Sequence, residues 1–74
     1  MDQKELKILA MDWLRKAVVA LDQVELAQRE AGLWEVNFKE LRADKATLEG
    51  DLPGGTVELM QEWIDRIERC AKGL

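Results

Sequence analysis

Few residues in this chain could do chemistry, and the commonest catalytic types are missing. The sequence has no His, no Tyr and no Ser, which removes most general bases and the usual hydroxyl nucleophiles. Its single thiol, Cys70, has no imidazole to activate it and cannot form a disulfide within the chain. Carboxylates and lysines remain, but either would need a desolvated pocket that 74 residues can hardly enclose. The sequence therefore predicts no enzymatic activity, no cofactor and no small-molecule substrate.

Two further patterns fall short of ligand sites. Glu58, Glu62 and Asp65 follow one side of a predicted helix, but they lack the loop spacing of a calcium site and are typical of a solvated face. Residues 51–55, Asp-Leu-Pro-Gly-Gly, lack the longer glycine spacing and the lysine of a phosphate-binding loop. They predict a type II turn instead, with a glycine at positive φ after Pro53. No metal site is predicted.

The elements that must position these residues are helices. Residues 2–31 contain no Gly and no Pro and predict one long helix that Gly32 ends, with a break near Asp22 as the alternative. Asn37 and Glu40 have the pattern of a helix N-terminus, which predicts a second helix over residues 38–49. It would be short and end at Gly50.

Thr56 is the predicted N-cap of a third helix, which extends to about Lys72 and is clearly amphipathic. The second and third helices together approach the length of the first, so we expect them to lie along it one after the other. A compact three-helix bundle whose first helix is broken or protrudes is the competing arrangement. We predict a single all-α domain over residues 1–74, a small helical bundle of three helices. A chain this short buries a marginal core, so we expect oligomerisation to complete it.

The first predicted helix is apolar on two sides, and this predicts an interface. Its wide side, which we assign to the core, contains Leu6, Leu9, Ala10, Trp13, Leu14, Ala17, Val18, Ala20, Leu21, Val24, Ala27 and Ala31. Ile8, Val19 and Leu26 lie together on the opposite side. A helix with two apolar sides usually has two neighbours, so this narrow strip predicts contact with another copy or another protein. Trp34, in the connection after Gly32, either folds onto the core or joins the interface as an anchor.

Residues 25–33, Glu-Leu-Ala-Gln-Arg-Glu-Ala-Gly-Leu, resemble the first helix and turn of a repressor-type helix-turn-helix. The resemblance implies a DNA-binding regulator whose motif occupies residues 20–45. In this sequence Ala27 and Gly32 are one residue farther apart than the corresponding pair in that family. The segment that would enter the groove, residues 34–42, has only Lys39 and Arg42 as bases. The formal net charge of −4, evenly spread, also argues against nucleic acid as a partner.

We therefore expect a small protein-interaction module, such as an adaptor, an assembly factor or an inhibitor-type accessory protein. Its expected partners are itself, as a homodimer or larger homo-oligomer, and another protein. A structural subunit of a larger assembly fits the same sequence. The longest apolar run, residues 17–21, is too short to span a bilayer, and the single cysteine suits the cytoplasm. Its small size and lack of catalytic groups suit an accessory protein of a phage or mobile element.

Overall fold

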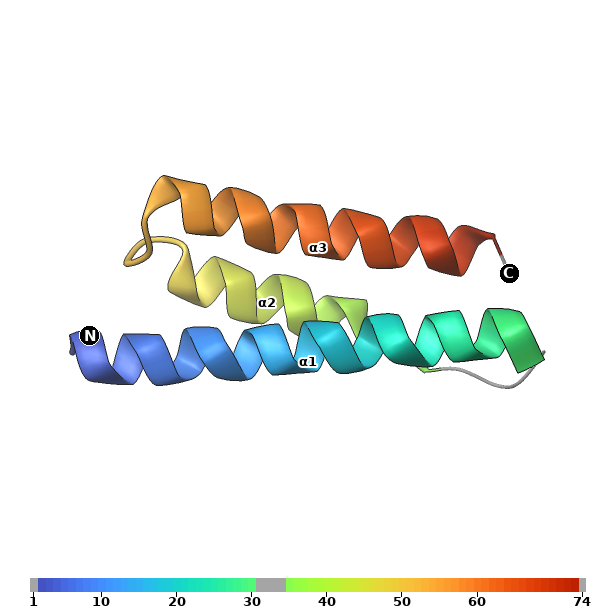
Figure 1. Ribbon diagram of the computed structural model, residues 1–74. Helices are drawn as coiled ribbons and strands as arrows, with labels where there is room; N and C mark the ends of the chain where they lie inside the picture. The colour runs from blue at the N-terminus through green and yellow to red at the C-terminus, as the bar shows by residue number, and fades with distance from the viewer. Residues whose placement is uncertain (1, 31–34, 74) are drawn as a thin grey trace.

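The computed structural model describes residues 2–30 and 35–73, which form three α-helices (Figure 1). α1 spans Gln3–Glu30, α2 spans Phe38–Leu48 and α3 spans Gly54–Lys72. These ranges contain no strand, so the all-α class and the three predicted helices are confirmed. The molecule is an elongated bundle with extents of 43 × 17 × 17 Å.

α1 is one continuous helix, as its lack of Gly and Pro predicts. It passes through Asp22 without a break, so the alternative of two shorter helices is wrong. At its start a side-chain oxygen of Asp2 accepts a hydrogen bond from the Lys4 amide at 3.4 Å, which satisfies one of the free N–H groups of the first turn. Gly32, the predicted end signal, lies outside the described residues.

The three helices lie side by side, and each contacts both of the others. Figure 1 shows α2 running back along the N-terminal part of α1, and α3 running beside α1 in the same direction. At the far end the Gln28 side chain donates a hydrogen bond to the Cys70 carbonyl at 2.6 Å. The predicted end-to-end layout along α1 is therefore wrong. Side-by-side packing gives each helix two neighbours, and this buries Ile64 and Ile67 completely.

α1 and α2 form an antiparallel pair, and this differs from the geometry that the helix-turn-helix resemblance implies. In that motif two helices joined by a short turn cross at a steep angle. Here α1 ends at Glu30 and α2 begins at Phe38, and Trp13 of α1 reaches Leu41 of α2. The helices around residues 20–45 thus pack lengthwise.

The core lies where the three helices meet. Its buried members are Trp13, Ala17, Ala20, Leu21, Val24, Leu41, Leu48, Met60, Ile64 and Ile67. The alanines of α1 leave room for its neighbours to approach closely. The buried side of α1 is narrower than predicted, because Leu9, Leu14 and Val18 are exposed by 38%, 44% and 39%. α2 and α3 both pack on one side of α1, so side chains at the margins of its wide apolar side stay in water.

The helix ends follow the predictions in part. Asn37 caps α2 as expected, since its side-chain oxygen accepts a hydrogen bond from the Glu40 amide at 3.0 Å. The N-cap of α3 is Pro53, so the prediction of Thr56 is wrong. Pro53 has φ −59° and ψ 146°, and its carbonyl accepts hydrogen bonds from the Thr56 and Val57 amides.

The two glycines after Pro53 belong to α3, so this helix begins closer to the N-terminus of the chain than predicted. Neither Gly54 nor Gly55 has a positive φ, so the predicted type II turn is also wrong. Pro53 with its fixed φ suits the residue before a helix, and glycine accepts helical angles as readily as turn angles. Gly50 likewise has no positive φ, and α2 ends at Leu48 with Glu49 as its C-cap.

Candidate interaction surface

The candidate functional feature of this structure is a set of large apolar side chains in contact with water. α1 exposes most of them, and α3 adds Leu59 near its N-terminus. Among the described residues the exposed large apolar side chains are Ile8, Leu9, Met11, Leu14, Val18, Val19, Leu26 and Leu59. Their positions on the helices decide which of them form one surface.

Met11, Leu14 and Val18 lie on the edge of α1 that borders α3. Leu14, Leu21 and Gln28 recur at heptad spacing and therefore share one side of the helix. Gln28 hydrogen-bonds to the Cys70 carbonyl of α3, so this side is the one nearest to α3. Met11 and Val18 are one turn before and one turn after Leu14, on its outer side.

Leu59 and Trp63 lie on the matching edge of α3. Trp63 and Cys70 are also at heptad spacing, and Leu59 is one turn before Trp63. α1 and α3 run in the same direction, and Gln28 of α1 contacts Cys70 of α3. Counting the same number of residues toward the N-terminus of each helix from this contact places Leu59 of α3 level with Ala17 of α1. Leu59 is therefore close to the levels of Leu14 and Val18.

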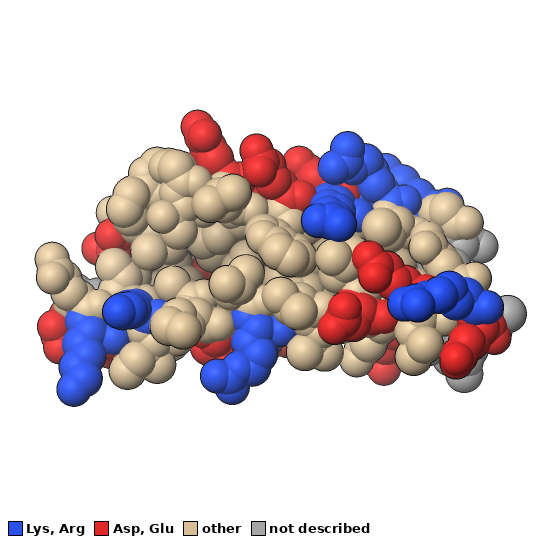
Figure 2. Space-filling model, viewed as in Figure 1, with Lys and Arg blue, Asp and Glu red and all other residues tan. Residues whose placement is uncertain are grey.

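We call Met11, Leu14, Val18, Leu59 and Trp63 the α1–α3 face. Figure 2 shows a broad area of uncharged residues across the N-terminal halves of both helices, with charged side chains around it. Met11 and Leu59 are exposed by 60% and 57%. A contiguous apolar area on a small protein is typical of an interaction surface.

Trp63 anchors the α3 edge of this face. Its ring is half-buried against the core, and the Arg66 guanidinium lies 5.9 Å from the ring centroid. A shallow depression of about 420 Å³ lies here, between Leu59, Trp63 and Arg66. An aromatic ring with a charged neighbour at the margin of an apolar face is the usual composition of a protein-binding surface.

The predicted strip of Ile8, Val19 and Leu26 is exposed, but it does not form one patch. These side chains are exposed by 61%, 48% and 51%. Ile8 is roughly 16 Å along the helix from Val19, and Val19 is roughly 10 Å from Leu26. Val19 lines a groove of about 310 Å³ between α1 and the start of α2. Trp34 lies outside the described residues, and a role of the strip in binding stays a prediction.

The sequence did contain the signal for the α1–α3 face. Met11, Leu14 and Val18 have the spacing of one helical stripe. Leu14 and Val18 were assigned to the core and Met11 to neither stripe, because the sequence does not show which part of a wide apolar side its neighbours cover.

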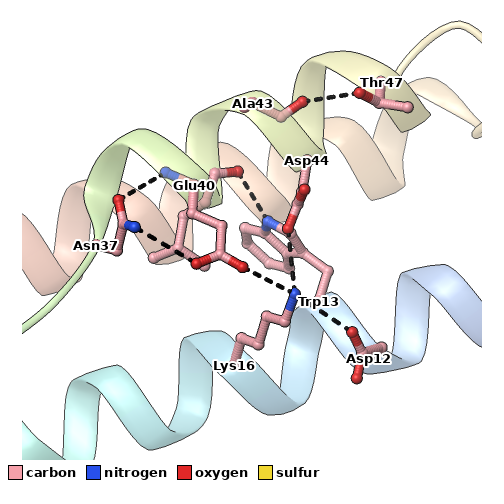
Figure 3. Close-up of polar contacts among 9 residues, drawn as sticks. Asp12, Trp13, Lys16, Asn37, Glu40, Ala43, Asp44 and Thr47 are labelled. Atoms are coloured by element: carbon pink, nitrogen blue, oxygen red, sulfur yellow. Dashed lines mark hydrogen bonds and ion pairs between the residues drawn. The ribbon is translucent and has the colours of Figure 1, made fainter.

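A polar cluster on the other side of α1 holds α2 in place (Figure 3). The Lys16 ammonium lies 3.5 Å from Asp12, 3.2 Å from Glu40 and 3.4 Å from Asp44. Beside it, the Trp13 indole N–H donates a hydrogen bond of 2.9 Å to the Leu41 carbonyl. These contacts keep α2 away from the α1–α3 face, which leaves that face open.

The Lys16 cluster predicts a dependence of stability on pH. Hydrogen bonds to Glu40 first and Asp44 second raise the pKa of Lys16 above its ordinary 10.5. The folded protein then holds this proton more tightly than the unfolded chain, so the stabilisation is complete below the unfolded pKa and lost as pH rises through the folded one. We expect the free energy of unfolding, from urea titrations at about pH 9 and about pH 11.5, to fall more in wild type than in Lys16→Met. Equal losses in both proteins would contradict this, and the difference is small because Lys16 is exposed.

Cys70 is half-buried, and within residues 2–30 and 35–73 no cluster of His, Cys, Asp or Glu could hold a metal ion. No helix in the same ranges is both long and apolar enough to cross a membrane.

Comparison of the sequence with known protein families and with curated proteins gave no match, and neither did comparison of the structure with solved structures.

Proposed function

We propose that this protein is a small, non-enzymatic protein-interaction module that self-associates through the α1–α3 face. The observation that carries the proposal is the exposure of Met11, Leu14, Val18 and Leu59 on the same side of the bundle, in the broad uncharged area of Figure 2. A soluble monomer rarely leaves so many large apolar side chains together in water.

The energetics favour covering this face. Full burial of one large aliphatic side chain stabilises a protein by about 1.5–3 kcal/mol. A two-fold dimer buries each such side chain twice, once from each copy. The small core makes this gain important, because a domain of this size has little stability to spare.

A single substitution tests the proposal. Leu14→Lys places a charge in the middle of the face, and we expect it to convert the wild-type oligomer to a monomer. Leu14 is partly exposed, so circular dichroism should show unchanged helicity. The measurement is the solution mass from light scattering across a range of protein concentrations.

Val19→Lys is the matched control, since Val19 is about as exposed as Leu14 but belongs to the sequence-predicted strip. We expect this variant to stay associated. Dissociation by Val19→Lys and not by Leu14→Lys would move the interface to the strip of Ile8, Val19 and Leu26. A wild-type protein that is monomeric at all concentrations would overturn self-association.

A further inference from the structure

Charges of opposite sign lie on α1 at the two ends of its apolar stripe. Lys4 and Lys7 precede Met11, Leu14 and Val18, and Asp22 and Glu25 follow them. Steps of three or four residues separate these positions, so they form one line along the helix. Figure 2 shows basic side chains near the start of α1, then a mainly uncharged stretch, then acidic side chains.

The four charges at the ends are available to a partner. Lys4, Lys7, Asp22 and Glu25 all lie in the described part of the chain, and none of them forms an ion pair with another described residue. The ion pairs that do occur join Lys16, Arg42 and Lys45 to acidic residues elsewhere on the surface.

We propose that a second copy of this chain packs on the face with its α1 antiparallel to the first, an arrangement that rests on the proposed self-association. A two-fold axis midway between Leu14 and Val18 brings Leu14 of one copy beside Val18 of the other. The same axis brings Lys7 of one copy beside Glu25 of the other. This follows because the midpoint between Lys7 and Glu25 along the helix is also the midpoint between Leu14 and Val18. Lys4 and Asp22 add a second charge of the same sign at the basic and the acidic end, and symmetry makes every contact twice.

The charge order selects this orientation over a parallel one. A parallel pair would place Lys4 and Lys7 against the same lysines of the other copy, and Asp22 and Glu25 against the same acids. Like charges facing each other suppress such a pairing, whereas opposite charges fix orientation and register. Arg15 lies beside the apolar residues, and its aliphatic stem can cover them while its charge stays in water.

The size of the molecule fits this arrangement. A stable dimer removes roughly 800 Å² per partner from water, and the chain exposes 5345 Å². Contact along most of the 43 Å length supplies a long, narrow interface. Leu59 and Trp63 flank α1 on the α3 side, where the second copy can cover them.

A charge-swap experiment tests the arrangement. The double variants Lys4→Glu/Lys7→Glu and Asp22→Lys/Glu25→Lys each put like charges at both ends of the interface. We expect each alone to raise the dimer dissociation constant about tenfold or more. An equal mixture restores opposite charges at both ends, so it should form a heterodimer about as tight as the wild type. Analytical ultracentrifugation measures both constants at low salt, where such pairs are least screened.

The controls separate this inference from the proposed function. Lys39→Glu, on the exposed surface of α2, changes the net charge away from the face and should leave dimerisation unchanged. If both double variants dimerise as well as the wild type, or their mixture does not restore dimerisation, the antiparallel arrangement is overturned while self-association stands. A monomeric wild type overturns both.

Discussion

Replacement of Trp13 by Ala should remove a large part of the free energy of unfolding of this protein. Trp13 is only 2% exposed and contacts the core where α1 meets α2. Removing such a ring from a core costs about 3–5 kcal/mol. The substitution also leaves the Leu41 carbonyl without the indole hydrogen bond. This loss approaches the whole stability of a small domain, which is about 5–15 kcal/mol.

Urea titration followed by circular dichroism measures the loss. Trp13→Phe keeps most of the ring volume and removes the hydrogen bond, so it should cost only about 1–3 kcal/mol. Trp63→Ala serves as the second comparison, because Trp63 is half-buried at the margin of the core and should cost less than Trp13→Ala. A Trp13→Ala protein as stable as Trp63→Ala would contradict the placement of Trp13 at the centre of the fold.

The second large effect concerns α3. Ile67 is completely buried, and Ile67→Ala should lower the free energy of unfolding by about 2–5 kcal/mol through lost contacts and a residual cavity. The exposed Leu59 on the same helix gives the matched case, because Leu59→Ala removes a similar volume from the surface. Leu59→Ala should change monomer stability by less than about 0.5 kcal/mol and weaken self-association instead.

Two measurements distinguish these roles. Thermal or urea unfolding at low protein concentration reports monomer stability, and light scattering at high concentration reports association. Ile67→Ala should strongly lower the stability of the monomer, and Leu59→Ala should mainly weaken association. Equal losses of stability in the two variants would place Leu59 in the core and remove it from the α1–α3 face.

Local signals in the sequence identified most of the helical structure. The stretch without Gly or Pro became the continuous α1, and the Asn37 cap correctly marked Phe38 as the start of α2. The third helix was predicted to be amphipathic, and α3 buries Met60, Ile64 and Ile67 at helical spacing. These features depend on backbone propensity, side-chain capping and helical periodicity, which are properties of neighbouring residues.

The sequence patterns that led to wrong predictions were each compatible with more than one structure. Thr56 is a good N-cap residue, yet helix α3 already begins at Gly54 because Pro53 suits the preceding position. Glycine permits a turn as readily as a helix, so Gly54 and Gly55 did not distinguish them. The lengths of the helices were equally compatible with end-to-end and side-by-side packing.

The sequence by itself thus determined three helices, the cap of α2 and two apolar sides on α1. Only the tertiary structure decided that α2 and α3 both pack on one side of α1, which buries Trp13 and Val24 and leaves Leu14 and Val18 exposed. Periodicity states which side chains share a side of a helix, but the number and direction of its neighbours determine how much of that side is covered. That coverage depends on contacts between residues far apart in the chain, such as Trp13 with Leu41 and Gln28 with Cys70.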